Sequence, residues 1–394
     1  MRKFRKSRQQ NLGGNLALLT ASVLLAFALC EVVIRQLPAS DMMGWTMVPP
    51  AAARAAAAGE KRPGLPRILV LGDSFTEWRD NNGESYPRVA AQILAQSGQS
   101  VDVVNLAEAG TGLTEYMGNL LRHGPGLRPD LVLIGLYLGN DLVPSSPSLE
   151  TTEGEAAARK ESVRDGDRSP IWRLLKKSVA LNYVYRLAKQ RIPALRSGFF
   201  DQTLAYAAGQ TGLDHASLQA RLAEIDPALV DAARADAING WDLAVAVTDP
   251  DYYGDLAGLE PGSKQGIAAE ASFRDLRALI ARARSLGAEV AVVLLPPPVW
   301  VAERYQEHFR RLGYGRLGPV AGELALISRL KAELSGSGVT AIDPLASLRD
   351  SAADTYLPRD IHPNRLGQRK IGEAVAAFLP DLLPAKAGPK AAAP

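Results

Sequence analysis

The stretch RILVLGDSF, residues 67–75, places a short apolar run directly before a glycine, an acid and a serine. A run of this length, rich in branched side chains, is typical of a buried parallel strand. In parallel sheets, functional residues gather beyond the carboxyl ends of the strands. The stretch therefore predicts a strand over 67–71 and makes Ser74 a candidate nucleophile. The alternative is that Ser74 is an ordinary residue of a polar turn.

Four more apolar runs follow along the chain, with helical patterns between them. The strands that they predict are Val101–Leu106, Leu131–Leu136, Glu289–Leu295 and Val339–Ile342. The helical patterns cover Tyr86–Gln96, Thr114–Leu121, Ala268–Ser285, Ala321–Leu334 and Arg365–Phe378. Strands that alternate with helices predict an α/β fold, with a parallel five-stranded sheet and helices on both faces.

Residues 144–266 interrupt this alternation. The segment is helical in pattern, charged and too long for a simple crossover, so we expect a helical cap insertion. Within it, residues 171–192 form a basic amphipathic pattern. A packed cap helix with a solvated basic face is favoured there over a contact with a membrane surface or an anionic polymer.

The N-terminus predicts a membrane anchor. A basic stretch precedes the apolar run Leu16–Ile34. We expect a cytoplasmic segment at 1–14 and a signal-anchor helix at 15–37 that crosses the inner membrane once, with the rest of the chain periplasmic. A cleaved signal peptide is the alternative, although no convincing cleavage site follows. The single cysteine, Cys30, follows Leu29 rather than the small residue that a lipoprotein signal requires.

Two other segments have the composition of unstructured chain. Residues 38–66, which include PPAAARAAAAGEKRPGLP at 49–66, predict a flexible linker. The tail at 381–394 predicts disorder. The catalytic domain is then expected to cover 67–380.

Charge and metal-binding patterns exclude several classes of function. The net charge is +3, and subtracting the five basic residues among the first eight leaves about −2 for the remainder, which gives no case for nucleic-acid binding. No cysteine or histidine cluster has zinc spacing. The calcium-like segment at 249–260 has Tyr253 where an oxygen ligand is needed. In AGTGLTE, Glu115 replaces the third glycine of a dinucleotide fingerprint. We therefore expect no cofactor and no metal.

The second and third predicted strands also end in polar clusters. NLAEAGTG, residues 105–112, follows the second, and LYLGNDL, residues 136–142, ends the third. A serine hydrolase needs donors that stabilise an oxyanion. The candidates are the backbone N–H of Ser74, the backbone N–H of Gly110 and the side-chain amide of Asn140.

The candidate general base is identified from the positions of the four histidines relative to the predicted strands. His123 precedes the third strand and so belongs to the opposite edge of the sheet, His215 lies in the insertion, and His308 lies in an amphipathic surface stretch. His362 lies between the fifth strand and the last helix, at the same edge as Ser74. Asp360, two residues earlier, is placed to orient its imidazole.

Together these blocks resemble the SGNH/GDSL hydrolase superfamily. GDSF carries Ser74, NLAEAGTG carries Gly110, GND carries Asn140, and DIHPN carries Asp360 and His362. The resemblance covers about residues 67–142 and 289–378. It implies a three-layer α/β/α, flavodoxin-like fold with strand order 2-1-3-4-5, and ester hydrolysis or acyl transfer without a metal.

The chain departs from the family pattern at the catalytic acid. The usual acid lies three residues before the histidine, where this chain has Arg359. Its D-x-H spacing is similar to that of members that act on bacterial envelope polysaccharides. The block around Ser74 also lacks the second glycine of a G-x-S-x-G nucleophile elbow.

These residues predict a serine esterase that forms an acyl-enzyme at Ser74. Its substrate would be a small-molecule or polysaccharide ester, such as an acetyl ester. Two alternatives stay open. One is an O-acyltransferase that uses the same site to modify an envelope polysaccharide. The other is a non-enzymatic scaffold or binding module.

Overall fold

The computed structural model describes residues 18–30, 32, 51–77, 84–143, 145, 147–161, 188, 192, 198–235, 237–260, 262–358 and 360–384. The predicted cytoplasmic segment at 1–14 and the tail beyond 384 lie outside these residues. So does the basic amphipathic segment at 171–192, apart from two of its residues.

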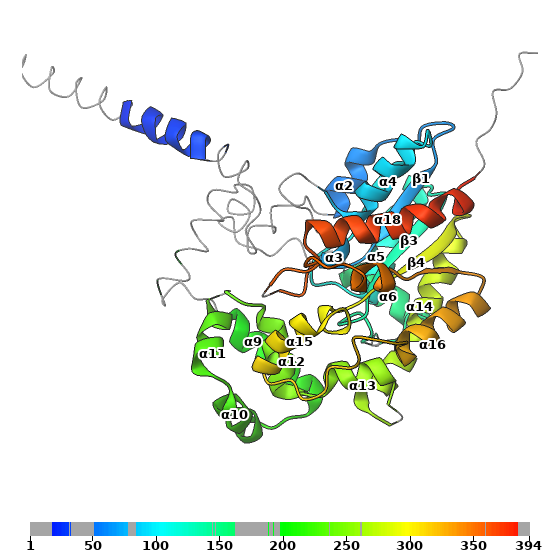
Figure 1. Cartoon of the computed structure of the whole chain (residues 1–394). Helices are drawn as coiled ribbons and strands as arrows, with labels where there is room; N and C mark the ends of the chain where they lie inside the picture. The colour runs from blue at the N-terminus through cyan, green and yellow to red at the C-terminus, as the bar shows by residue number, and fades with distance from the viewer. Residues whose placement is uncertain are drawn as a thin grey trace, which may run out of the picture.

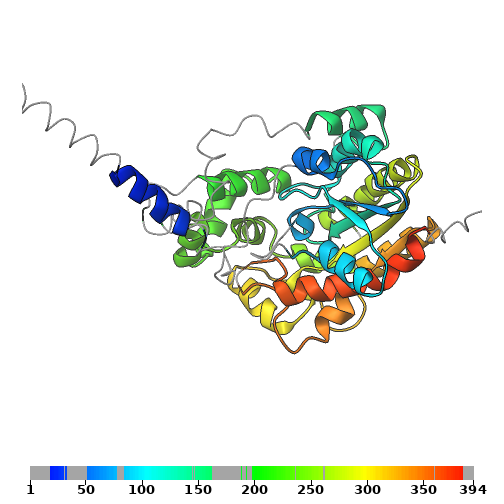
Figure 2. The ribbon, with the colours of Figure 1, turned by 90° about the horizontal axis from the view of Figure 1, so that it is seen from above.

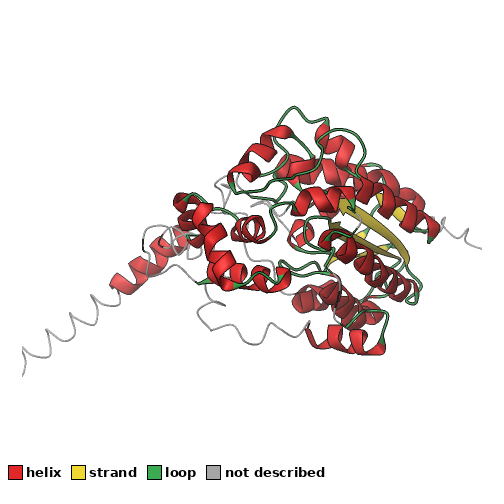
Figure 3. Cartoon of the chain, turned by 90° about the horizontal axis from the view of Figure 1, so that it is seen from below, coloured by secondary structure: helices red, strands yellow, loops and turns green. Residues whose placement is uncertain are grey.

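A parallel five-stranded sheet forms the centre of the molecule, as predicted (Figure 3). Its strand order is β2-β1-β3-β4-β5, which is the order that the family resemblance implied. Every residue of β1 and β3 is buried, because helices cover both faces of the sheet. The strands are β1 (Arg67–Leu71), β2 (Asp102–Asn105), β3 (Leu131–Tyr137), β4 (Glu289–Leu295) and β5 (Thr340–Ile342).

The order of the strands explains the three layers. The crossover from β1 to β2 runs in one direction along the sheet, and the later crossovers run in the other. Right-handed crossovers then place α4 on one face and α5, α14 and α16 on the other. After β5, α18 packs beside α4 (Figure 2). These helices are α4 (Tyr86–Gln96), α5 (Leu113–Leu127), α14 (Lys264–Arg284), α16 (Ala325–Gly336) and α18 (Arg365–Leu382).

The inserted region is helical, as expected. Its later helices, from α9 to α13, lie below the sheet in Figure 1, whereas α6 packs against α5. Aspartate and asparagine side chains accept hydrogen bonds from the first N–H groups of α10, α11 and α12, which explains why such short helices begin where they do. Its helices are α6 (Thr152–Glu161), α9 (Phe199–Thr211), α10 (His215–Glu224), α11 (Pro227–Arg234), α12 (Gly240–Thr248) and α13 (Tyr252–Gly258).

Short helices follow three of the strands, β1, β4 and β5. They are α3 (Ser74–Glu77), the 3₁₀ helix η3 (Pro298–Trp300), α15 (Glu303–Arg311) and α17 (Leu345–Arg349).

The prediction of a flexible linker over 38–66 was wrong for its second half. Residues Ala51–Ala58 form helix α2, which packs against β2 and α5. Alanine has the highest helix propensity, and its small side chain allows close packing. The buried guanidinium of Arg67 then donates to the carbonyl groups of Ala58, Gly59 and Glu60. The chain is thereby fixed to the domain from residue 51 onward.

The two ends of the predicted domain also differ slightly from expectation. Helix α18 continues to Leu382, so the prediction of disorder was wrong for residues 381–382. Residues 18–30, within the predicted anchor, are helical, and their large apolar side chains are mostly exposed. None of the helices within the described residues combines the length and the apolarity needed to cross a membrane.

Candidate active site

Ser74 begins helix α3, directly after β1. A Cβ at Gly72 would collide with the side chain of Thr76, so the chain needs glycine at this sharp turn. Asp73 Oδ1 accepts a hydrogen bond from the Phe75 N–H at 2.9 Å, which fixes the first turn of the helix. The Ser74 side chain is thus held at the carboxyl end of a central strand, and the residue is 8% exposed.

The structure brings His362 and Asp360 together with Ser74. His362 Nε2 lies 2.7 Å from Ser74 Oγ. On the other side of the ring, Nδ1 contacts Asp360 Oδ1, which also accepts the His362 backbone N–H at 3.1 Å. A proton on Nδ1 is favoured by this carboxylate, so Nε2 is left to accept the serine proton. The D-x-H spacing therefore allows Asp360 to orient His362 toward Ser74. It does so although the acid of the SGNH/GDSL hydrolases usually lies three residues before the histidine.

The loop that carries His362 is held by groups on both sides. Asn364 caps α18 by accepting the Gly367 N–H at 3.0 Å. The Tyr305 hydroxyl accepts the backbone N–H groups of Thr355 and Tyr356 at 2.8 and 3.1 Å. The sequence analysis missed Tyr305, because it lies in a stretch interpreted as surface. The available signal was the spacing of Tyr305 and Phe309, which lie four residues apart and so share one face of a helix that is otherwise charged.

The charge state of Asp360 suits the orienting role. Burial alone would raise the pKa of this carboxyl. The charge and the hydrogen bonds of His362, together with nearby backbone N–H groups, outweigh burial and hold the pKa of Asp360 below its usual value. Asp360 is therefore ionised at neutral pH and can stabilise an imidazolium.

Two further carboxyls lie beneath the site. Burial raises the pKa of Asp73 to about 7, although the hydrogen bond from the Phe75 N–H and the charge of His362 both lower it. Burial, and then the charge of Asp73, raise the pKa of Asp141 well above its usual value. Asp141 Oδ2 accepts the Tyr137 N–H at 2.8 Å and the Tyr116 hydroxyl at 2.9 Å. These acids support the strand-end loops, and they resist being charged at the same time.

The proposed oxyanion donors lie on neighbouring strand ends. Gly110 has a positive φ of 74°, which glycine adopts without strain. Its loop is joined to the turn before Ser74 by a hydrogen bond from the Glu108 N–H to the Gly72 carbonyl at 3.0 Å. Asn140 lies in the turn after β3, where its N–H donates to the Tyr137 carbonyl at 3.3 Å. Parallel neighbours in the order β2-β1-β3 therefore bring both loops to the Ser74 edge.

The inserted region contacts this edge through groups that the sequence analysis missed. The Tyr252 hydroxyl, from α13, donates to the Gly139 carbonyl at 3.0 Å in a buried contact. Asp242 of α12 is buried, and burial followed by the charge of Asp360 raises its pKa well above the usual value. The insertion thus packs directly behind the loop of Asn140.

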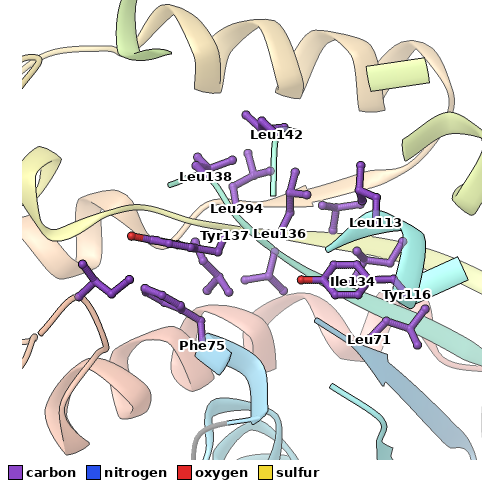
Figure 4. Close-up of a cluster of buried hydrophobic side chains, with 14 of the residues drawn as sticks. Leu71, Phe75, Leu113, Tyr116, Ile134, Leu136, Tyr137, Leu138, Leu142 and Leu294 are labelled. Atoms are coloured by element: carbon purple, nitrogen blue, oxygen red, sulfur yellow. The ribbon is translucent and has the colours of Figure 1, made fainter. Parts of the chain in front are cut away.

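Aromatic side chains pack beside His362. The rings of Phe75 and Tyr137 stack with centroids 3.6 Å apart, at one side of the apolar cluster of Figure 4. The ring of Phe75 also lies 4.9 Å from that of His362. This contact places an aromatic ring against one side of the imidazole.

The remaining predictions about site residues concern groups elsewhere in the chain. His123 lies near the end of α5, His215 begins α10, and His308 lies on α15. The calcium-like segment contains α13, in which Tyr253 is buried. Across the described part of the chain, no three histidine, cysteine or acidic side chains are grouped to hold a metal.

Comparisons with known proteins found similar folds among solved structures. No family model matches the chain, and no curated protein matches it. A GDSL-like lipase from Bacteroides thetaiotaomicron is similar at 8% identity and a TM-score of 0.36, over 84% of this chain and 95% of that one. A lipase/acylhydrolase from Enterococcus faecalis is similar at 10% identity and a TM-score of 0.36, over 81% and 97%.

A catalytic mutant of an acetylxylan esterase from Geobacillus stearothermophilus is also similar. It shares 12% identity at a TM-score of 0.36, over 80% of this chain and 93% of that one. The assignment of the site rests on this chain's own geometry. In strand order, and in the gathering of Ser74, Gly110, Asn140 and His362 at one sheet edge, the chain has the architecture that its resemblance to the SGNH/GDSL hydrolases implies.

Proposed function

We propose that the chain is a serine esterase that cleaves an acyl ester through an acyl-enzyme at Ser74. One observation carries the proposal. Ser74 Oγ lies 2.7 Å from His362 Nε2, while Asp360 contacts the other ring nitrogen. A nucleophile bonded to a base, and a base oriented by an acid, form the arrangement that activates a serine hydroxyl.

In the first half-reaction, His362 Nε2 takes the proton from Ser74 as Oγ attacks the ester carbonyl carbon. The N–H groups of Ser74 and Gly110 and the amide of Asn140 stabilise the oxyanion. The tetrahedral intermediate collapses, and the imidazolium gives its proton to the leaving alcohol. The acyl group is then bonded to Ser74 Oγ.

In the second half-reaction, water attacks the acyl-enzyme and His362 takes its proton. Collapse of the second intermediate releases the acid and returns the proton to Ser74. Asp360 stays ionised throughout and stabilises the imidazolium in both steps. Because Asp360 has a lowered pKa, this role is available at neutral pH and below.

The second candidate replaces water with an alcohol of an envelope polysaccharide. The same site would then act as an O-acyltransferase. What supports it is the shielding of the catalytic pair, since Ser74 is 8% and His362 2% exposed. A shielded acyl-enzyme reacts preferentially with an acceptor that binds beside it.

We also place the domain in the periplasm, attached to the inner membrane through residues 15–37. Support comes from the basic residues before the apolar run and from the exposed apolar side chains of residues 18–30. A fusion reporter at the C-terminus that is active only in the periplasm tests this location. Activity of a cytoplasmic reporter would exclude it.

A fluorophosphonate probe tests the proposed chemistry. The wild-type chain should acquire one adduct at Ser74, and Ser74→Ala should acquire none. A wild-type chain without an adduct would favour the scaffold or binding module. Product analysis with an acetyl ester and a sugar acceptor then separates the two enzymes. Free acetate indicates a hydrolase, and acetylated sugar indicates a transferase.

A further inference from the structure

Helix α2 contacts the loop that carries Gly110. The Ala51 N–H donates to Glu108 Oε1 at 2.9 Å, and the Arg54 guanidinium donates to the Ala107 carbonyl. From the other side, Asn119 Nδ2 donates to Glu108 Oε2 at 3.3 Å. These contacts fix the residues that lead directly to Gly110.

Arg54 also connects the loop to the helix of the nucleophile. Its guanidinium lies 3.7 Å from Glu77 Oε1, and Glu77 Oε2 accepts the Ala109 N–H at 2.8 Å. Glu77 ends the single turn of α3 that Ser74 begins. One ion pair therefore joins α2, the nucleophile turn and the residue before Gly110.

Partial burial makes the attraction between these two charges stronger than in an ordinary surface pair. The side chains of Arg54 and Glu77 are 8% and 17% exposed. Water screens such a pair less than one at the surface. Ala109 and Gly110, by contrast, are exposed, and a Cβ at Gly110 would have no neighbouring atom within 4 Å. Polar contacts rather than packing hold this end of the loop.

We propose that Arg54 is a positioning residue for the Gly110 oxyanion donor. The inference rests on the proposed function, in which the Gly110 N–H stabilises the developing oxyanion. Such a donor contributes only when it is fixed before the reaction begins. Arg54 supplies this constraint at Ala107, and through Glu77 at Ala109. The segment whose composition predicts a tether thus acts on the active site.

The experiment compares Arg54→Ala with Arg62→Ala in the full chain. Arg62 is an exposed arginine of the same segment and serves as the matched control. Turnover of p-nitrophenyl acetate is divided by the number of sites that a fluorophosphonate labels. Arg54→Ala should lower kcat about tenfold and change KM less than about twofold, because the donor acts mainly in the transition state. Arg62→Ala should match the wild type.

Two more variants address folding. Arg54→Lys keeps a charge beside Glu77 and should recover part of the lost kcat. The double variant Arg54→Met with Glu77→Gln leaves no lone buried charge, so it should fold even where Arg54→Ala does not. It should show the same loss of kcat as Arg54→Ala. Wild-type kcat in Arg54→Ala, or in the double variant, would overturn the proposal.

Hydrogen exchange separates this proposal from the proposed function. The peptide 106–112 should exchange faster in Arg54→Ala than in Arg62→Ala, with other core peptides unchanged. Unchanged exchange in this peptide would also overturn the role of Arg54. Absence of Ser74-dependent turnover in the wild type would instead overturn the esterase, and the exchange result would still report on the loop.

Discussion

The sheet and the inserted region place polar groups at the active site in different ways. In the sheet, fully buried strands such as β1 and β3 end together, and the residues just beyond their ends become neighbours. In the inserted region, short capped helices bring single side chains against the back of the site, as Tyr252 does. The strand order therefore places the candidate site residues at one edge of the sheet, and single side chains of the insertion hold the loops that carry them.

The largest effect should come from the sheet. Ser74→Ala removes the nucleophile, and kcat/KM for p-nitrophenyl acetate should fall by about 10⁴-fold or more. Ser97→Ala removes an exposed hydroxyl at the end of α4 and should leave turnover unchanged. Residual turnover of Ser74→Ala within tenfold of the wild type would show that the strand-end serine is not the nucleophile.

The next effect should come from the acid of the catalytic loop. Asp360→Asn keeps the shape of the side chain but no longer favours the proton on His362 Nδ1. We expect kcat to fall about 10²- to 10⁴-fold, with His362→Ala at least as damaging. Steady-state kinetics with a soluble ester measures both. Equal activity of Asp360→Asn and wild type would mean that Ser74 and His362 act without an acid.

A smaller effect should come from the insertion. Tyr252→Phe removes one buried hydrogen bond to the Gly139 carbonyl, which precedes the Asn140 donor. We expect kcat to fall about three- to tenfold with little change in KM, since one neutral hydrogen bond contributes about 1 kcal/mol. Tyr206→Phe, on an exposed tyrosine of α9, is the matched control. A Tyr252→Phe loss as large as that of Asp360→Asn would place the insertion among the catalytic elements.

The smallest effect on turnover should come from Asp242, which instead affects stability. Its raised pKa means that the folded chain keeps a proton that the unfolded chain releases above its ordinary value of 3.8. This group therefore lowers the free energy of unfolding as pH rises above that value. Asp242→Asn should make the slope between pH 5 and pH 8 shallower by the contribution of this group, while the raised pKa values of Asp73 and Asp141 still contribute. The kcat should stay within about twofold, because Asp242 contacts no reacting group.

Urea unfolding at the two pH values measures the slope. Asp350→Asn, at an exposed position, should leave the wild-type slope unchanged. A wild-type slope in Asp242→Asn would show that the buried carboxyl is already ionised in the folded chain.

Much of the sheet could be predicted from the sequence, because its strands are buried on both faces and give continuous apolar runs. The bounds of β1, β4 and α4 match the predicted ones. The short edge strand β5 begins one residue later than predicted, at Thr340. Ser74 could be grouped with Asp360 and His362 because Ser74 follows β1 and the other two lie between β5 and the last helix, at the same edge of the sheet.

Contacts between distant residues could not be predicted in the same way. The alanine-rich segment was interpreted as a linker, and its contacts with distant residues, such as that of Arg54 with Glu77, have no local signal in the sequence. Tyr252 lies inside a segment that resembles a calcium loop, so its contact with Gly139 has no local signal. Tyr305 was not singled out, because it lies in a mostly charged amphipathic stretch that was considered only for His308.

The direction of α2 has a mechanical consequence. The helix begins beside the catalytic edge, where the Ala51 N–H meets Glu108, and ends at the opposite edge, where Arg67 binds the carbonyls that follow it. Ala51, the first residue of α2, therefore lies at the same edge of the sheet as Ser74. If residues 15–37 anchor the chain in the membrane, as proposed, the point of attachment to the domain would lie on the same side as Ser74. Esters on the same surface would then meet the serine at a high effective concentration.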